Sequence, residues 1–367
     1  MRSKILIAGL LAAMLAHTPL PASATPPDKR EETAKALIAK LVKEDKATAA
    51  IIRVDRAVGG WTHSAGVRDL ASGAPASPNG HFRIGSVTKL LVATVLLQLV
   101  DEKRLALTDP IERHLPGVVP QGTKISVRQI LNHTSGLYDY MHEPGYSTNR
   151  WRGTARFRHY DPHDLLKVAF ADPAKSTTPG AAWSYSNTNY VVAGLLVEKL
   201  TGRPYGQEIK RRILRPYGLT QTMIPGDKPG LPTPHARGYE AFPDGDLVDA
   251  TRMNPSLDWA AGEMVSTGRD LNRFLAALAG GRILSSSSLA AMRTVQATDA
   301  GFGYGLGLQE YPLPCGAKAW GHSGELIGYL TFAFTSDDGT RMTLSVNPSR
   351  KPVTTSEIVA IATTAFC

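Results

Sequence analysis

Segments with the pattern of β-strands lie near both ends of this 367-residue chain, and helical patterns fill the middle. Near the start, an amphipathic helix at 31–46 precedes two antiparallel strands, 49–54 and 60–67, rich in β-branched or alternating residues. Strand patterns return at 302–308, 317–320, 328–335 and 341–346. One sheet can contain both the N-terminal and the C-terminal strands only if the two ends of the chain lie side by side. The sequence therefore predicts an α/β fold: an antiparallel sheet built from both termini, flanked by helices, with an inserted, mostly helical lobe.

Helical spacing of apolar residues recurs through the middle of the chain, at 87–103, 126–133, 162–171, 189–201, 205–213 and 268–280. Gly202 follows one of these segments and is typical of a helix C-terminal stop. There is no internal repeat and no long low-complexity linker, so we expect residues 25–367 to form one catalytic unit. Its sheet lobe would span about 30–85 and 285–367, and its helical lobe about 86–284.

The first 24 residues have the pattern of a signal peptide. Arg2 and Lys4 precede a short apolar core, and Ala22-Ser23-Ala24 matches an Ala-x-Ala cleavage site. The core is too short for a membrane anchor, so we predict a secreted, extracytoplasmic protein without stable membrane insertion. Removal of the leader would change the formal net charge from +9 to +7, which favours anionic partners such as the cell wall. No basic cluster interleaved with aromatic residues indicates a nucleic-acid partner.

Only two cysteines occur, Cys315 and the terminal Cys367. Neither has a His or Cys neighbour at ligand spacing, which disfavours metal-binding or catalytic thiols, whereas an oxidising compartment would allow a disulfide. We therefore predict a Cys315–Cys367 bond that fixes a C-terminal helix. The segment 159–164 has metal-capable side chains, but Pro162 interrupts it and no further ligand cluster supports it, so we expect neither a metal nor a cofactor.

Ser86-Val87-Thr88-Lys89, directly ahead of the apolar run 90–97, offers a nucleophile and its base. Residues three apart share one face of a helix, so Lys89 would lie beside Ser86 at the positive end of the helix dipole. A chain of this composition contains roughly one such tetrapeptide by chance. The prediction of a serine hydrolase therefore depends on a proton relay and on donors for an oxyanion elsewhere in the chain.

Two later segments could supply these groups: Tyr185-Ser186-Asn187, in a polar loop, and His322-Ser323-Gly324, between two strand patterns. The order S-x-x-K, Y-x-N, then K/H-x-G resembles the serine β-lactamase and penicillin-binding protein family. The similarity is greatest to its branch of class C β-lactamases, secreted D-Ala-D-Ala carboxypeptidases and related esterases. It extends from about residue 45 to the C-terminus and includes the flanks Phe82-Arg83-Ile84-Gly85, Leu131-Asn132-His133-Thr134-Ser135-Gly136-Leu137 and Asn187-Thr188-Asn189-Tyr190.

The resemblance implies that Ser86 is acylated and that Lys89 and Tyr185 share the duties of base and proton relay; either could be the base. The backbone N–H groups of Ser86 and Glu325 would form the oxyanion hole. Substrate contacts are implied for Asn187, which would also hold Lys89, and for His322, Ser323, Gly324, Glu325 and Trp259.

His322 would replace the lysine that other members of the family carry at this position. Because histidine titrates near neutrality, we expect His322 to supply a polar or cationic edge and to make the rate pH-dependent. His133, in the Leu131–Leu137 flank, is more consistent with a structural residue at a helix terminus than with a catalyst.

The chain departs from the carboxypeptidase pattern where those enzymes carry an arginine that clamps the substrate carboxylate. Gln309 stands near that place, and Lys318 could compensate from a neighbouring position. Glu325 would repel a carboxylate. We nevertheless expect a secreted D-Ala-D-Ala carboxypeptidase that acts on cell-wall peptides, is acylated by penicillins and is a monomer.

Other classes of protein remain as alternatives. An esterase or a class C-like β-lactamase could use the same scaffold, and a penicillin- or wall-binding sensor could lack turnover. The segment Gly321-His322-Ser323-Gly324-Glu325 is superficially similar to the nucleophile elbow G-x-S-x-G, but its fifth position is Glu, which disfavours an α/β-hydrolase.

Overall fold

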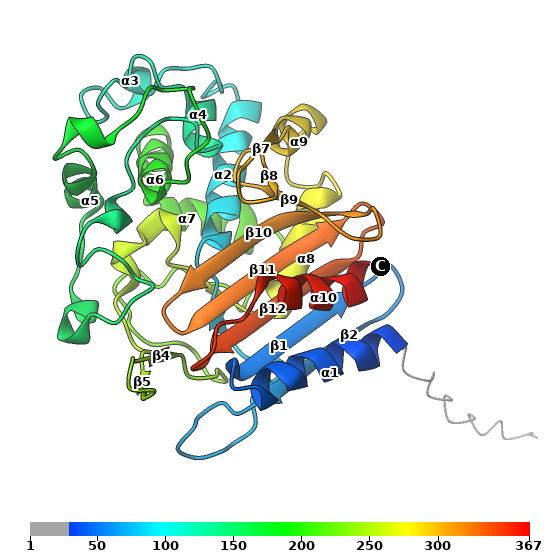
Figure 1. Ribbon diagram of the computed structural model, residues 1–367. Coiled ribbons are helices and arrows are strands. Elements are labelled where there is room, and N and C mark those ends of the chain that lie inside the picture. Colours follow the sequence, from blue (N-terminus) through cyan, green and yellow to red (C-terminus); the bar gives the residue numbers. More distant parts are fainter. Residues whose placement is uncertain (1–28) are drawn as a thin grey trace, which may run out of the picture.

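The computed structural model describes residues 29–367, so the predicted signal peptide, residues 1–24, lies outside the described residues. Both ends of the chain contribute to one eight-stranded antiparallel sheet, as predicted (Figure 1). Its order is β2–β1–β12–β11–β10–β9–β8–β7, which places the first strands of the chain beside the last. The strands are β1 (Ala47–Asp55), β2 (Gly60–Gly66), β7 (Gln296–Ala297), β8 (Gly303–Tyr304), β9 (Gln309–Pro312), β10 (Lys318–Leu326), β11 (Tyr329–Ser336) and β12 (Arg341–Pro348).

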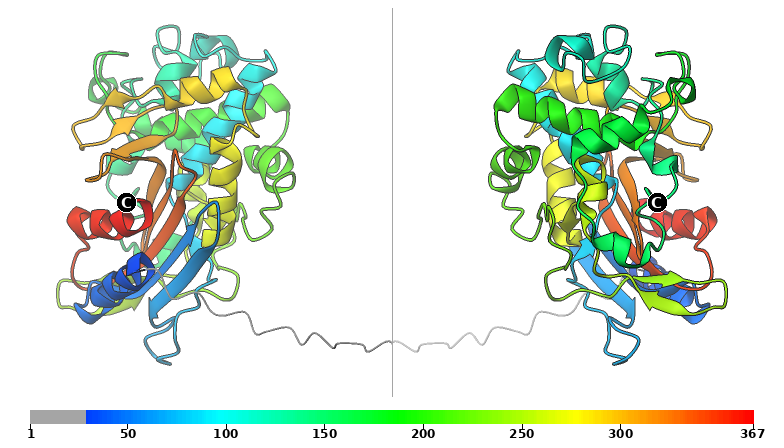
Figure 2. Two further views of the ribbon diagram at one scale, coloured as in Figure 1. Left: turned by 90° about the vertical axis from the view of Figure 1, so that its right-hand side faces the viewer. Right: turned by 90° about the vertical axis from the view of Figure 1, so that its left-hand side faces the viewer.

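Helices cover both faces of this sheet (Figure 2). Helices α1 (Lys29–Lys43) and α10 (Thr355–Phe366) pack against each other on one face, and α8 (Gly268–Ala279) packs on β1, β11 and β12 from the opposite side. The sequence assigned residues 268–280 to the helical lobe, but its apolar stripe is buried against the sheet. The predicted disulfide is confirmed: Cys315, after β9, is bonded to Cys367, at the end of α10.

The helical lobe lies between β2 and β7 in the chain and is centred on α2 (Val87–Asp101). Most side chains of α2 are buried on every side, as its continuous apolar run predicts. Around it lie α3 (Ile111–His114), α4 (Val127–Leu131), α5 (Pro162–Ala169), α6 (Asn187–Thr201), α7 (Tyr205–Ile209) and α9 (Ser286–Arg293). Two short ribbons complete the fold, β3 (Phe82–Arg83) with β6 (Val265–Ser266) and β4 (Tyr239–Ala241) with β5 (Leu247–Asp249).

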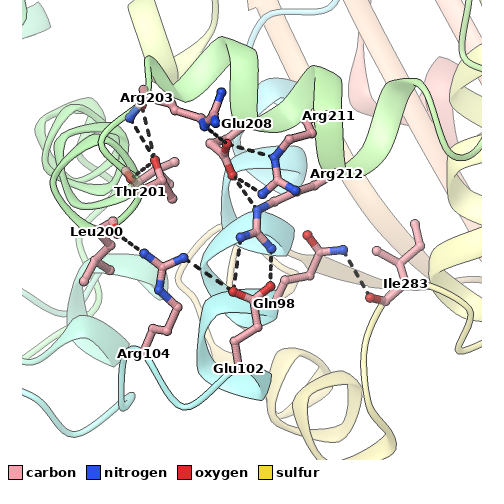
Figure 3. A network of polar contacts seen from close by, with 11 residues as sticks. Gln98, Glu102, Arg104, Leu200, Thr201, Arg203, Glu208, Arg211, Arg212 and Ile283 are labelled. Carbon is pink, nitrogen blue, oxygen red and sulfur yellow. Dashed lines mark hydrogen bonds and ion pairs between the residues drawn. The ribbon is translucent and has the colours of Figure 1, made fainter.

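An ion-pair network ties the C-terminal end of α2 to α7 (Figure 3). The carboxylate of Glu208 is fully buried and accepts hydrogen bonds from Arg211, at 2.7 Å, and Arg212, at 2.6 Å. These two guanidinium groups lower the pKa of Glu208 to about 2. Arg212 also pairs with Glu102, the residue that follows α2. Because a buried charge without its partner is strongly destabilising, the network fixes the position of the helix that begins at the predicted nucleophile.

Three elements differ from the expected boundaries. The helix expected at 205–213 is α7 followed by a π-helical turn, Lys210–Leu214. The strand expected at 317–320 continues to Leu326, because β11 pairs with β10 along its length. Of the pattern at 302–308, only Gly303–Tyr304 forms a strand, β8; a turn in which Gly307 has φ 69° follows, and β9 begins after it, at Gln309.

Candidate active site

The predicted nucleophile lies at the N-terminal end of α2. Ser86 is the N-cap residue, and Gly85 before it has φ 50°, a backbone conformation that favours glycine. A Cβ atom on Gly85 would lie 2.7 Å from the backbone nitrogen of Glu325, so this turn packs directly against β10. The same contact is seen from the strand, because a Cβ on Gly324 would lie 2.8 Å from the Ser86 nitrogen. The two glycines thus bring both predicted oxyanion donors to one place.

Lys89 lies one turn along α2, fully buried beside Ser86. Its Nζ donates to Ser86 Oγ at 2.9 Å, to Asn187 Oδ1 at 2.8 Å and to the carbonyl oxygen of Ala261 at 2.7 Å. Burial lowers the pKa of Lys89 to about 7, although the carboxylates of Asp139 and Asp258 oppose the shift. An uncharged amine is therefore well populated at neutral pH, within hydrogen-bond distance of the Ser86 hydroxyl.

Tyr185 completes the cluster from the loop before α6. Its hydroxyl donates to Ser86 Oγ at 2.7 Å, and Lys89 Nζ lies 5.0 Å from the centre of its ring. Burial raises the pKa of Tyr185 well above its ordinary value, and the hydrogen bond to Ser86 offsets only part of that shift. Tyr185 is therefore a phenol rather than a phenolate at neutral pH.

The expectation that His322 titrates near neutrality is wrong. Its imidazole is buried, and that burial, with the nearby charge of Lys89, lowers its pKa to about 3. His322 Nε2 lies 2.9 Å from the hydroxyl of Tyr304, and Nδ1 lies 2.5 Å from the carbonyl oxygen of Ser323. His322 is thus a neutral side chain held inside the protein, and it offers the cleft no cation.

A hydrogen-bonded chain that was not predicted from the sequence connects His322 with the Tyr185 loop. The Tyr304 hydroxyl lies 3.1 Å from His133 Nε2, and His133 Nδ1 accepts from the Ser186 N–H at 3.2 Å. The His133 ring also lies over that of Tyr185, with 4.3 Å between centroids. His133 is buried at φ 61° just after α4, which agrees with the structural role expected for it.

An open cleft of about 370 Å³ lies over these groups. Five of the predicted residues line it together with Ser86 and Tyr185: Asn187, His322, Ser323, Gly324 and Glu325. Its remaining walls are mostly apolar and were not predicted from the sequence: Met141, Trp183, Phe302, Tyr311, Leu330 and Phe332, together with the polar Asn149 and the acidic Asp258. Gln309 lines the cleft as well. Gln309, expected near this place, accepts from the Ser323 N–H at 2.8 Å.

Trp259 does not line the cleft, contrary to the sequence-based expectation. It lines a separate cavity with Tyr205 and Glu263, and its ring lies 4.8 Å from that of Tyr205. Its neighbour Asp258 faces the cleft instead. One oxygen of Asp258 accepts from Thr148 at 2.9 Å, and burial raises its pKa to about 6.

The other candidate cations and ligands have partners outside the cleft. Lys318, considered as a substitute for the missing arginine, pairs with Glu310 at 3.1 Å and is not among the residues that line the cleft. His159 pairs with Asp227 at 2.6 Å. Within residues 29–367 no group of three or more His, Cys, Asp or Glu side chains is placed to hold a metal ion, and none of the helices described is long and apolar enough to cross a membrane.

The sequence of this chain, whose fold brings Ser86, Lys89 and Tyr185 together, matches a family model for Beta-lactamase over residues 34–363. The chain therefore belongs to the beta-lactamase family. Penicillin-binding protein 4* of Bacillus subtilis (strain 168) is 29% identical over 285 residues, which are 74% of this chain and 61% of that protein. The chain thus matches less than two thirds of the length of this relative.

Two solved structures match this chain over nearly its whole length. A D-stereospecific amidohydrolase from Streptomyces sp. is 36% identical, with a TM-score of 0.85, over 93% of this chain and 99% of that chain. The D-amino acid amidase from Ochrobactrum anthropi SV3, complexed with L-phenylalanine amide, is 25% identical, with a TM-score of 0.81, over 92% of this chain and 98% of that chain.

Proposed function

We propose that this serine hydrolase cleaves amides of apolar D-amino acids through an acyl-enzyme on Ser86. The observation that carries the proposal is the charge of the cleft: the acids Asp258 and Glu325 line it, and no arginine or lysine does so among the described residues. A free α-ammonium group suits such a cleft, whereas a terminal carboxylate would be repelled. The names of the two structural relatives, a D-stereospecific amidohydrolase and a D-amino acid amidase, support the same substrate class.

The contacts of Ser86 support the following division of catalytic roles. Uncharged Lys89 accepts the Ser86 proton as Oγ forms a bond with the substrate carbonyl carbon, and the N–H groups of Ser86 and Glu325 donate to the resulting oxyanion. Collapse of this intermediate breaks the C–N bond. The leaving nitrogen takes a proton from the Tyr185 hydroxyl, and the proton on Lys89 restores the phenol. Water then hydrolyses the acyl-enzyme by the same proton transfers in reverse.

Glu325 gives the cleft its preference for an amine. Its backbone nitrogen is one of the two proposed oxyanion donors, and the residue lines the same cleft as Ser86. The side chain is exposed and lines the cleft, and partial burial raises its pKa. A substrate ammonium group near this carboxylate would form a charge-assisted hydrogen bond.

D-Ala-D-Ala carboxypeptidase activity is the second candidate function, supported by the similarity to penicillin-binding protein 4*. It requires a partner for the terminal carboxylate of the peptide. The oxygen of the Gln309 amide accepts from Ser323, and only the amide nitrogen could donate to a carboxylate. Such a neutral contact is weaker than the bidentate pair of an arginine with a carboxylate. An esterase on the same machinery needs no carboxylate partner and remains compatible with this cleft.

Hydrolysis of D-phenylalanine amide, L-phenylalanine amide and diacetyl-Lys-D-Ala-D-Ala by the purified protein tests the proposal. We expect D-phenylalanine amide to be preferred, and Ser86→Ala to abolish both turnover and the mass increase of an acyl-enzyme. Glu325→Gln is the matched control for the ammonium site, because it keeps the backbone donor and removes the charge. It should lower kcat/KM for D-phenylalanine amide about tenfold or more and leave N-acetyl-D-phenylalanine amide nearly unaffected. Faster release of D-Ala than of ammonia would favour the carboxypeptidase instead.

We also propose that the protein is exported and acts as a monomer. The proposal of export depends on the signal-peptide pattern of residues 1–24. Light scattering tests the monomer, because it would distinguish a single chain from an octamer such as the penicillin-binding protein homologue of Pyrococcus abyssi.

A further inference from the structure

An apolar groove of about 180 Å³ lies between α10 and the face of the sheet that α10 covers. Phe334 and Met342 form its floor, and Ile358, Val359 and Phe366 of α10 form one wall. Among the described residues none with a charged side chain lines it. The disulfide from Cys367 to Cys315 fixes the end of α10, so this wall is held in place.

The groove adjoins the catalytic cleft, with which it shares part of its wall. Tyr311, Leu330 and Phe332 line both cavities. In the register of β10 and β11, Leu330 lies opposite Glu325 and Phe332 lies opposite Ser323. Side chains of paired residues share one face of a sheet. The two apolar residues therefore stand on the same face as the Ser323 and Glu325 side chains of the cleft.

A row of aromatic rings runs from the catalytic tyrosine into the groove. Successive ring centroids are 6.4 Å apart for Tyr185 and Trp183, 6.0 Å for Trp183 and Phe302, 5.0 Å for Phe302 and Tyr311, and 5.3 Å for Tyr311 and Phe334. An apolar group attached to the reacting carbonyl could thus follow a continuous apolar surface away from Ser86.

We propose that this groove is a second subsite of the catalytic cleft and binds an unbranched alkyl or acyl chain of the substrate. The inference rests on the proposed acyl transfer by Ser86 and adds a preference for long apolar acyl groups. The volume of the groove would admit roughly six groups the size of a water molecule or methylene, at about 30 Å³ each. A hydrocarbon chain fits the uncharged lining, because each methylene removed from water contributes favourably to binding.

A series of p-nitrophenyl esters from acetate to decanoate tests the chain-length preference, with each rate divided by that of spontaneous hydrolysis. We expect kcat/KM to rise about two- to fourfold per methylene over roughly the first six and then to level off. A flat series, with short esters still hydrolysed through Ser86, would overturn the subsite and leave the proposed function intact.

Two variants separate the groove from the cleft. Ile358→Glu puts a charge in the groove and Val359→Trp fills it with apolar bulk; either should flatten the series while p-nitrophenyl acetate is hydrolysed as before. Ala360→Glu places the same charge on the exposed side of α10 and should leave the series unchanged. A series in Val359→Trp as steep as that of the native protein would count against the groove.

Binding without turnover distinguishes failure of the subsite from failure of the proposed function. If no ester acylates Ser86, the proposed function is wrong, and calorimetry with octanamide and acetamide on Ser86→Ala then decides the groove alone. Tighter binding of octanamide, lost on adding Ile358→Glu, supports the subsite, and equal binding of the two amides refutes it.

Discussion

The pH dependence of acylation is the most direct test of the roles assigned to Lys89 and Tyr185. The pKa of Lys89 is lowered to about 7 by burial, so its base form increases as the pH rises through that value. The neutral fraction is about 9% at pH 6 and about 91% at pH 8. We therefore expect kcat/KM to rise about tenfold between these two pH values and to remain level above pH 8.

p-Nitrophenyl butyrate is the substrate of choice, because it has no titrating group and kcat/KM reports the free enzyme. The α-amino group of an amino acid amide would titrate in the same range and obscure the result. Rates between pH 5 and 10 are corrected for spontaneous hydrolysis. Tyr185→Phe should lower the plateau without moving the midpoint, because a phenol with a raised pKa does not titrate in this range.

A rate that continues to rise tenfold per pH unit to pH 10 would refute this reasoning. That result would mean either that Lys89 keeps the pKa of a solvated lysine or that a phenolate of Tyr185 is the base. His322→Asn serves as a control for the other titratable group of the motif. Since the pKa of His322 is lowered to about 3, its removal should leave the midpoint near 7.

Three further changes test neighbouring parts of the structure. Asp258→Asn should move the midpoint of the pH profile to lower pH by roughly half to one unit, because it removes a carboxylate that raises the pKa of Lys89. Gly324→Ala should lower kcat about 10²- to 10³-fold with folding retained by circular dichroism, because its Cβ would lie 2.8 Å from the Ser86 nitrogen and 2.0 Å from the Ile84 oxygen, displacing the oxyanion donors. Replacing Cys315 and Cys367 together by Ser should lower the free energy of unfolding by about 4 kcal/mol, since the bond closes a loop with a sequence separation of 52. An unchanged midpoint in guanidinium chloride would show that α10 does not need the bond.

The architecture was predictable because the patterns that specify it are local. Apolar, β-branched or alternating residues at 49–54 and 341–346 mark two strands, which the structure buries on both faces as β1 and β12, and their pairing follows from the need to complete one sheet. The continuous apolar run after Ser86 predicts a buried helix, because a helix that is apolar on every side has no face for solvent. The resemblance implied that Lys89 and Tyr185 act on Ser86, and the structure places their polar atoms 2.9 and 2.7 Å from Ser86 Oγ.

The errors concern properties that arise only from long-range packing. The sequence shows a histidine in place of a lysine, but the pKa of His322 depends on its burial and on the nearby charge of Lys89. Trp259 and Asp258 are adjacent in the chain, yet they face different cavities, and Trp259 has the unusual φ of 38°. No periodicity predicts such a reversal, because residues in a 3₁₀ turn have no fixed inward face.

The neutrality of His322 also bears on the substrate. Replacement of a lysine by a histidine at this strand is not an exchange of one cation for another, because burial destabilises the charged imidazolium and lowers the pKa of His322. The Gln309 oxygen accepts a hydrogen bond from Ser323, and Lys318 forms an ion pair with Glu310. A substrate carboxylate at this end of the cleft would be desolvated without a cationic partner, beside the carboxylate of Glu325. The neutral His322, the hydrogen-bonded Gln309 and the paired Lys318 thus leave a substrate carboxylate without a cation, which favours an amine-bearing or neutral acyl group. His322→Lys alone should restore little carboxypeptidase activity while Glu325 remains.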